Sequence, residues 1–313
     1  MQKYLFGVLF SIKNLIEWRK NLYFVEQINY VMILVVDGGS TKTHVTIIGN
    51  SSNSKEILMP GINPYYQSES EIADLIQQNI TLDLATVSKV YHYGAGCSFP
   101  EKKDIVRKAW LRFCSKADVF VDSDMLGAAK AVLGDEDGIA CILGTGANSC
   151  FCKNGKIERN VPPLGFILGD EGSGAYLGGK LVADAMKGIL PSDLVDGLYA
   201  QFGCTPQDIM NAVYKQPLPS RYLASFVPFI ASNIKRPEIK SIVENAFTLF
   251  FRRNVALYGQ SACKLGFVGG VAKQFEQELK SVADDFGFPN VEILGDPMPG
   301  LIAYHKNLLK PKN

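Results

Sequence analysis

The chain has 313 residues, of which 47% are hydrophobic and 20% are charged, a composition typical of a globular protein long enough for two domains. Its 32 basic and 31 acidic residues nearly cancel, so its charge gives no reason to expect nucleic acid or an anionic membrane as a partner. The 7 cysteines fit no even disulfide framework and show no pair of pairs at zinc-ligand spacing. We therefore expect reduced, mostly buried thiols in a cytoplasmic protein.

Residues 1–31 differ in character from the rest of the chain. Aromatic and apolar residues are mixed there with scattered basic residues, without the clean apolar core of a signal peptide or a run long enough to span a bilayer. Met32 directly precedes the first clear strand. We expect residues 1–31 to be an N-terminal extension that is absent from the native chain, or a loosely packed helix.

The stretch LVVDGGSTKT at residues 34–43 combines a short buried strand with a glycine turn. The strand ends in Asp37, at a position where a hydrated magnesium ion can be held. The two glycines after it let backbone N–H groups approach an anion closely, and the next two residues add hydroxyl donors. We predict a phosphate-binding hairpin, with further strands over residues 44–49 and 55–59.

Strands and helices alternate after this hairpin. We predict helices over residues 69–80, 101–115 and 125–133, and strands over residues 90–93 and 118–121. The loop before the first of these helices, PGINPY, is rich in turn formers and carries an amide, Asn63, near its centre. The second strand runs into the acids Asp122 and Asp124, and Asp124 can cap the next helix.

The opening layout repeats about one domain-length later. A strand over residues 139–143 runs into a second glycine turn, GTG at residues 144–146, and short strands over 149–152 and 156–158 come next. The two copies share no extended identity, so only their layout repeats. An acidic pair, Asp170-Glu171, then lies within the glycine-rich stretch LGFILGDEGSGAYLGGK.

The rest of the chain is mostly helical. We predict a helix over residues 238–264, a strand over 266–268, a helix over 271–285, a strand over 291–294 and a helix over 300–309. A third glycine turn, GG at residues 269–270, comes after the first of these strands. The alternation of strands and helices indicates an α/β protein, with domain boundaries in short hinges near residues 133–138 and near Asn290.

Several common motifs are absent. The sequence contains no Walker loop, and GAG at residues 94–96 lacks the third glycine of a dinucleotide fingerprint. It contains neither HExxH nor G-x-S-x-G, and its three histidines are too far apart in sequence to favour a histidine-bound metal. One glycine turn after an apolar strand is weak evidence for a ligand. Three in order, with the acids Asp37 and Asp124 before and between them, indicate phosphate binding.

Taken in order, DGGSTKT, a strand-end aspartate, LGTGANS, GDEGS and VGGVA resemble the sugar kinase/heat-shock cognate/actin superfamily. The resemblance is most specific to the N-acetylglucosamine kinase branch of the BadF/BadG/BcrA/BcrD ATPases, and it covers residues 32–310. The zinc signature of the ROK sugar kinases is missing. The resemblance implies an α/β fold of two actin-like (ribonuclease H-like) domains with a cleft between them. We assign residues 32–135 plus 291–313 to domain I, and residues 136–290 to domain II.

The resemblance also implies roles for individual residues. The positions that match the nucleotide-binding loops are Asp37, Gly38, Gly39, Ser40, Thr41, Gly144, Thr145, Gly146, Gly269 and Gly270. Asp37 is expected to lie near Mg²⁺, whereas Lys42 is expected to be peripheral. Asp124 matches the catalytic base, with Asp122 as a competing candidate. The positions that match sugar contacts are Asn63, Asn148 and Asp170. The simpler alternatives are a helix cap for Asp124 and ordinary turns at Asn63 and Asp170.

The expected function is transfer of a phosphoryl group from ATP, with Mg²⁺, to the 6-hydroxyl of an N-acetylated hexosamine, with N-acetylglucosamine favoured. Such a reaction requires fixed phosphates, a bridging cation, an oriented base and closure against water. Glucosamine and N-acetylmuramic acid remain alternative acceptors, since one polar contact can decide between them. An ATPase that activates a partner enzyme and a non-catalytic sugar or nucleotide sensor remain open. We expect a small amino sugar as the partner, neither nucleic acid nor membrane, and leave a homodimer open.

Overall fold

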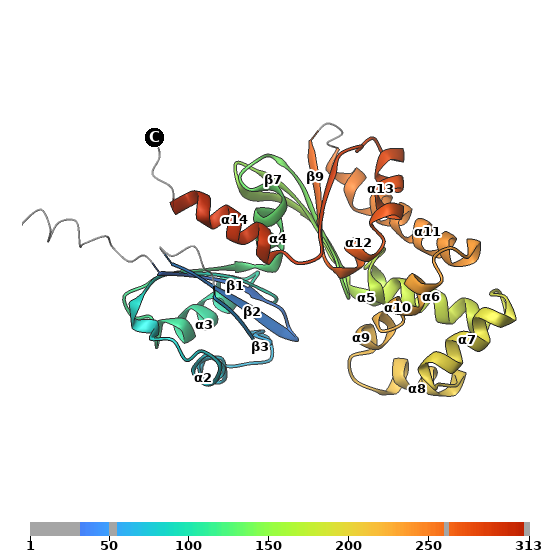
Figure 1. The fold of residues 1–313 in the computed structure, drawn as a ribbon, viewed down its shortest axis with the longest axis horizontal. Coiled ribbons are helices and arrows are strands. Elements are labelled where there is room, and N and C mark those ends of the chain that lie inside the picture. Colours follow the sequence, from blue (N-terminus) through green and yellow to red (C-terminus); the bar gives the residue numbers. More distant parts are fainter. Residues whose placement is uncertain (1–31, 50–54, 260–262, 310–313) are drawn as a thin grey trace, which may run out of the picture.

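The computed structural model describes residues 32–49, 55–259 and 263–309 (Figure 1). The expectation for residues 1–31 lies outside these ranges. The described residues form two five-stranded sheets, each covered by its own helices, with two further helices between the sheets. Within these ranges, no helix is both long enough and apolar enough to span a membrane.

The first sheet has the strand order β3-β2-β1-β4-β5. Its strands are β1 (Met32–Gly38), β2 (Lys42–Ile48), β3 (Lys55–Pro60), β4 (Val87–Gly94) and β5 (Asp118–Ser123). The first three strands form an antiparallel meander, whereas β4 runs parallel to β1 and β5 runs parallel to β4. The carboxyl ends of β1, β4 and β5 therefore meet at one edge, where Gly38 pairs with Gly94 and Gly94 with Ser123.

Helices connect these strands on both faces of the first sheet. They are α2 (Glu69–Asn79), the single turn η1 (Leu84–Thr86), α3 (Pro100–Leu111) and α4 (Asp124–Leu133). Ser68 caps α2 through a capping box with Glu71, and Ser123 caps α4 by accepting from the Leu126 N–H group. The sequence prediction that Asp124 caps this helix is therefore off by one residue, because Asp124 is the first helical residue.

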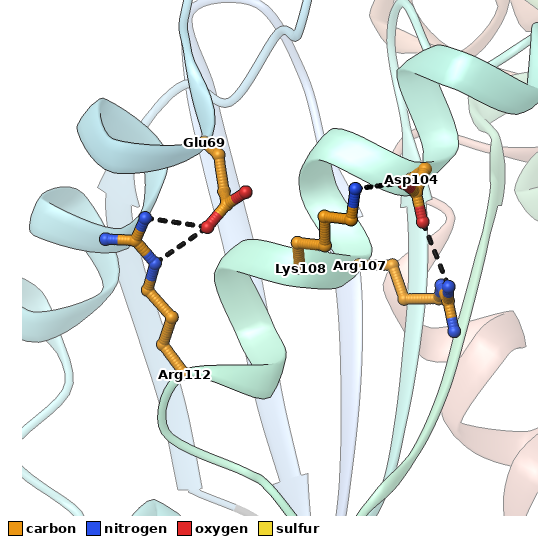
Figure 2. Close-up of polar contacts among 5 residues, drawn as sticks. All are labelled: Glu69, Asp104, Arg107, Lys108 and Arg112. Atoms are coloured by element: carbon orange, nitrogen blue, oxygen red, sulfur yellow. Dashed lines mark hydrogen bonds and ion pairs between the residues drawn. The ribbon is translucent and has the colours of Figure 1, made fainter.

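Ion pairs lie on the exposed surface of α2 and α3 (Figure 2). Arg112, just after α3, binds Glu69 at the start of α2, with its Nη2 2.7 Å from Oε1. Within α3, Asp104 binds both Arg107 and Lys108. Exposed pairs of this kind contribute about 0–1 kcal/mol each. The stability of this layer must therefore come from the apolar residues beneath it, which include Ile72, Ile76, Val106 and the fully buried Trp110.

The second sheet has the order β10-β9-β6-β7-β8, which is the same topology as the first. Its strands are β6 (Gly138–Leu143), β7 (Ala147–Lys153), β8 (Lys156–Val161), β9 (Lys264–Val268) and β10 (Val291–Leu294). The predicted repeat of layout is therefore confirmed. One assignment is wrong: β10 pairs with β9 in the second sheet, so the expected boundary at residue 290 cuts a strand away from its own sheet.

Helices fill the long connection between β8 and β9 and follow both β9 and β10. They are α5 (Gly165–Leu168), α6 (Gly174–Met186), α7 (Ser192–Phe202), α8 (Pro206–Lys215), α9 (Pro219–Ala224), α10 (Val227–Ser232), α11 (Pro237–Arg253), η2 (Val255–Tyr258), α12 (Gly270–Gln274), α13 (Glu276–Asp285) and α14 (Met298–Leu309). The predicted helix over residues 238–264 is wrong in its second half. The helix ends at Arg253, since Asn254 has non-helical dihedral angles, and β9 already begins at Lys264.

Three apolar cores hold the molecule together. The largest lies between the second sheet and its helices and includes the five phenylalanines that the sequence places in a helix core: Phe226, Phe229, Phe247, Phe250 and Phe251. The second lies under α2 and α3. The third lies between the two sheets and contains residues of α4 and α14 together with Val35 and Ala140 (Figure 1). Five of the seven cysteines are buried, as expected, and Cys204 and Cys263 are partly exposed.

Candidate active site

Three carboxylates from separate parts of the chain meet at the carboxyl edge of the first sheet. Asp37 is the penultimate residue of β1, Asp124 begins α4 after β5, and Asp296 lies just after β10. Burial, and then the charges of Asp296 and Asp124, raise the pKa of Asp37 to about 7, while Lys42 opposes the shift. A buried carboxylate beside two others is under repulsion that a bound cation would relieve.

The two candidate bases, Asp122 and Asp124, have different surroundings. Asp122 forms an ion pair with Lys103, Oδ2 to Nζ at 2.7 Å, and lines a separate cavity beside Tyr93 and Phe120. Burial raises the pKa of Asp124, although its carboxylate accepts from the Met125 N–H group at 2.9 Å. Of the two candidate bases, Asp124 alone contributes to the electrostatic environment of Asp37. Asp124, and not Asp122, therefore acts on the carboxylate that precedes the first glycine turn.

Close contacts leave no room for a side chain at the two glycines of the first turn. A Cβ on Gly38 would lie 2.8 Å from Nε2 of the buried His92, and a Cβ on Gly39 would lie 2.9 Å from the Lys42 carbonyl oxygen. Neither glycine has a positive φ, so their small size matters here rather than an unusual backbone conformation. Ser40 and Thr41 are exposed at the tip of the turn, where their hydroxyl groups face other segments.

The second and third glycine turns lie against each other. The φ of Gly269 is +128°, and a Cβ there would lie 2.3 Å from the Leu143 carbonyl oxygen, directly before Gly144. Gly144 in turn accepts a hydrogen bond from the Gly174 N–H group at 2.8 Å, and Thr145 accepts one from Ala175 at 3.1 Å. The start of α6 therefore braces the second turn. Gly270 has open space around its Cα, which leaves room for a ligand.

Asp170 lies directly on the second glycine turn. Its Oδ1 accepts from the Ala147 N–H group at 3.2 Å, and a Cβ on Gly146 would lie 3.0 Å from its Oδ2. Its φ is +57°, a strained value for a residue that is not glycine. Burial raises the pKa of Asp170. It lines a cavity of about 230 Å³ together with Glu171, whose Oε1 lies 2.5 Å from Nε of Arg253.

The two asparagines that resemble sugar-binding residues lie on different domains. Asn63 donates from Nδ2 to the Ser40 hydroxyl oxygen at 2.8 Å, so its loop contacts the first glycine turn. A Cβ on Gly96 would lie 2.4 Å from the Asn63 Oδ1, which shows how tightly the next loop packs on it. Asn148, on β7, accepts through Oδ1 from the Asn160 amide at 3.0 Å. Asn63 thus adjoins the first glycine turn, and Asn148 comes directly after the second.

Two residues of this region were not predicted from the sequence. Asp296 lies after a strand and a glycine in the string ILGDP, so the strand-end rule that identified Asp37 was also available for it. Arg221, on α9, donates from Nη2 to the Thr41 hydroxyl oxygen. No sequence pattern signalled this contact, because its partners are 180 residues apart and lie on different domains.

No model of a known protein family matches the chain. A solved structure of a proposed N-acetylglucosamine kinase from Porphyromonas gingivalis is 41% identical, with a TM-score of 0.83 over 88% of this chain and 99% of that one. Among curated proteins, the N-acetylmuramic acid/N-acetylglucosamine kinase of Clostridium acetobutylicum is 26% identical over 64% of this chain and 70% of its own length.

A more distant structure shares the fold. The ROK glucokinase of Streptomyces griseus, solved with glucose and AMPPNP, has a TM-score of 0.52 at 15% identity, over 88% of this chain and 98% of that one. At this identity the likeness shows a shared fold alone. The expected fold class is therefore confirmed by the sheet topology and by the match at 41% identity together.

Proposed function

Because this chain belongs to the N-acetylglucosamine kinase family of actin-like sugar kinases, we propose that it transfers the γ-phosphoryl group of ATP to the 6-hydroxyl of an N-acetylated hexosamine. The observation that carries this proposal is the convergence of Asp37 and Asp124 at the carboxyl ends of β1 and β5. A nucleotide-side carboxylate and a base then lie at the same edge of the first sheet.

Asp124 is the proposed general base. It would accept the proton of the sugar hydroxyl as the oxygen attacks the γ-phosphorus, and it would return that proton to solvent after product release. Burial raises its pKa, which makes its carboxylate a better proton acceptor than an exposed aspartate. An oriented base of this kind contributes about 10²- to 10⁴-fold in rate.

The residues around Asp37 suit Mg²⁺. Burial raises the pKa of Asp37 most, and the charges of Asp296 and Asp124 raise it further. Proteins usually hold Mg²⁺ through one or two carboxylates, waters and substrate phosphates, and Asp37 would supply such a carboxylate. When bound, Mg²⁺ would neutralise charge on the transferring phosphoryl group.

The glycine turns and the polar side chains complete the proposed site. The N–H groups of residues 38–41 and 144–146 would bind the phosphates, and the open space at Gly270 would accept the adenosine. We assign the sugar to Asn63, Asn148 and Asp170, which adjoin the first and second glycine turns. Closure of the two domains around both substrates would exclude water and limit ATP hydrolysis.

N-acetylmuramic acid is the second candidate acceptor, because the curated relative phosphorylates both sugars by its name. The alternative of an ATPase that activates a partner enzyme gains no support from the cysteines. Cys150 and Cys152 lie side by side with their sulfurs 3.7 Å apart, but both are buried within the second sheet. Buried reduced thiols support our expectation of a cytoplasmic protein.

The test is a panel of sugars assayed for ATP-dependent phosphorylation by coupled ADP release. We expect turnover with N-acetylglucosamine, weaker or equal turnover with N-acetylmuramic acid, and little with glucose or glucosamine. Phosphorus-coupled NMR of the product identifies the modified hydroxyl. Phosphorylation of unacetylated sugars alone would contradict the proposed acceptor, and ADP release independent of any sugar would favour the ATPase alternative.

A further inference from the structure

Arg221 joins the two domains across the cleft. It lies on α9 of the second domain, and its guanidinium donates from Nη2 to the Thr41 hydroxyl oxygen at the tip of the phosphate-binding hairpin in the first domain. Within the part of the chain that the structure describes, no carboxylate lies within ion-pair distance of this guanidinium. An arginine without a carboxylate partner therefore lies at the first glycine turn, which we propose to bind phosphate.

Tight packing fixes α9 relative to the second glycine turn. A Cβ on Gly178 of α6 would lie 1.8 Å from the Leu223 carbonyl oxygen of α9, so the two helices touch through their backbones. A Cβ on Gly174 would lie 3.1 Å from the Ala224 Cβ, and the Gly174 N–H group donates to the Gly144 carbonyl oxygen. Arg221 therefore belongs to the same rigid unit as the second phosphate-binding turn.

The backbone directly before α9 is strained. Leu218, directly before Pro219, has a φ of +59° and is 59% exposed, so no burial of its side chain explains the conformation. Strained residues persist where the surrounding structure imposes them, and they cluster at functional sites. Among the described residues, the other two that share this property are Asp170, at the second glycine turn, and Asn154, in the β7–β8 hairpin turn.

Charge supplies the reason for an arginine at this place. The carboxylates Asp37, Asp124 and Asp296 gather at the first turn, and Asp170 lies at the second. A polyphosphate placed between these turns needs cations, and a planar guanidinium binds phosphate oxygens in a bidentate manner. Lys42 is the other nearby cation on the first domain, and it already faces Asp37.

We propose that Arg221 binds the terminal phosphates of the nucleotide, exchanging the Thr41 hydroxyl for phosphate oxygens when ATP enters the cleft. This inference rests on the proposed function, since it deepens the account of the same site. It assigns the second domain a phosphate-binding cation that moves with the Gly144–Gly146 turn. The two domains would then be linked through the bound nucleotide in place of the Thr41 hydroxyl.

The experiment compares Arg221→Met and Arg221→Lys with Arg252→Met, a control at the exposed end of α11 in the same domain. Calorimetry with the full chain and Mg²⁺ measures the affinity for ATP, ADP, AMP and inorganic tripolyphosphate. We expect Arg221→Met to weaken ATP and tripolyphosphate binding about 10- to 100-fold. AMP and sugar binding should be nearly unchanged, Arg221→Lys should recover part of the loss, and Arg252→Met should match the wild type. Melting temperatures confirm that each variant is folded.

Equal ATP affinity in Arg221→Met and wild type would overturn the inference, and so would an equal loss for AMP and for ATP. The proposed function is judged separately, by sugar phosphorylation in the wild type. A wild-type protein that phosphorylates sugars while Arg221→Met keeps full ATP affinity contradicts only the role of Arg221. A wild-type protein that binds ATP, loses that binding in Arg221→Met and phosphorylates no sugar contradicts only the proposed function.

Discussion

Two aspartates separated by one residue in sequence have different chemical environments here. Asp122 and Asp124 both lie at the end of β5, and the sequence alone left the choice of base open. The side chain of Asp122 lies on the face of the strand that carries Phe120 and is paired with Lys103. Asp124 begins α4 and faces Asp37. Asp122 still belongs to the strand and Asp124 already belongs to the first turn of the helix, so the two carboxylates lie in different places.

This difference predicts how their amide variants behave. Asp124→Asn keeps the size and the backbone hydrogen bond but cannot accept a proton, so kcat should fall by about 10²- to 10⁴-fold while sugar affinity changes little. Asp122→Asn should retain kcat within a few-fold. Coupled ADP-release kinetics and calorimetric sugar binding measure both. Near-wild-type turnover in Asp124→Asn, or a large loss only in Asp122→Asn, would reverse the assignment.

The raised pKa of Asp37 predicts that this residue lowers the stability of the folded protein increasingly as the pH rises. Its pKa is about 7 in the folded protein against 3.8 for the free group, so folding disfavours the ionised form. Its stability contribution is therefore complete below about pH 4 and is lost as the pH rises through about 7. Removing the charge should stabilise the ligand-free protein where wild-type Asp37 is ionised.

We expect Asp37→Asn to raise the melting temperature in the absence of Mg²⁺ and nucleotide, by about 2–4 °C per kcal/mol gained, while abolishing activity. The gain should be larger at about pH 8 than at about pH 5, measured by differential scanning fluorimetry in EDTA. A gain that is equal at both pH values would show that the carboxylate charge is not the cause.

At the scale of elements, the sequence predicted the strands well and the helix ends less well. Each strand of the two sheets overlaps a predicted stretch, since short apolar runs that end in glycine turns leave few alternatives. The helix over residues 238–264 failed because apolar residues continue past Arg253. Just past the break at Asn254, Arg159 from β8 donates to the Leu257 and Tyr258 carbonyl oxygens. The hydrophobic periodicity of residues 238–264 cannot reveal a contact with a residue as distant in sequence as Arg159.

The glycines of the first turn show a similar limit. The sequence suggested that Gly38 serves a tight turn, but its φ is not positive, and the structure instead shows His92 beneath it. His92 is fully buried, and burial lowers its pKa to about 3, so its ring is neutral. The Trp110 indole donates to its Nδ1 at 3.2 Å, which places the ring proton on Nε2, facing Gly38 and Gly94. His92 and Trp110 therefore connect the first glycine turn to α3.

This arrangement predicts an asymmetry between two strand-end glycines. Gly38→Ala places a Cβ 2.8 Å from the fixed His92 ring and should cost about 1–3 kcal/mol of stability, with a matching loss of ATP affinity. Gly49→Ala, at the end of β2, meets no atom within 4 Å and should be nearly neutral. Combining Gly38→Ala with His92→Ala should cost less than the sum of the two single changes, because the crowding is then gone. Strict additivity in denaturant unfolding would contradict the contact.

At the scale of the whole molecule, the chain crosses twice between the sheets. It leaves the first sheet through α4 and enters β6, and it returns from β10 to α14, which packs against α4, β1 and β2 (Figure 1). The sequence located the first crossing near residues 133–138 but put the second one strand too early, because hydrophobicity does not tell which sheet a strand joins. The second crossing contains Asp296, so a movement between the domains would also move a carboxylate of the site.

The contact between α4 and α14 is close enough to test how far the two domains depend on each other. A Cβ on Gly300 would lie 2.4 Å from the Ala131 carbonyl oxygen, and α4 carries Asp124 at its first turn. Alanine normally stabilises a helix relative to glycine by about 1 kcal/mol. Gly300→Ala should instead destabilise the protein by about 1–3 kcal/mol, because the two helices must separate. Gly197→Ala in α7, whose nearest neighbour is 3.8 Å away, is the matched control and should be neutral or stabilising.

If α4 and α14 join both sheets into one cooperative unit, Gly300→Ala lowers a single melting transition and reduces kcat through displacement of Asp124, leaving ATP affinity less affected. Calorimetry and steady-state kinetics on the same samples measure both effects. Two separate transitions in the variant would mean that the domains unfold independently once this contact loosens. A melting temperature equal to that of Gly197→Ala would show that α14 can shift away from α4 without loss of stability. The core between the sheets would then not transmit a change at α14 to Asp124.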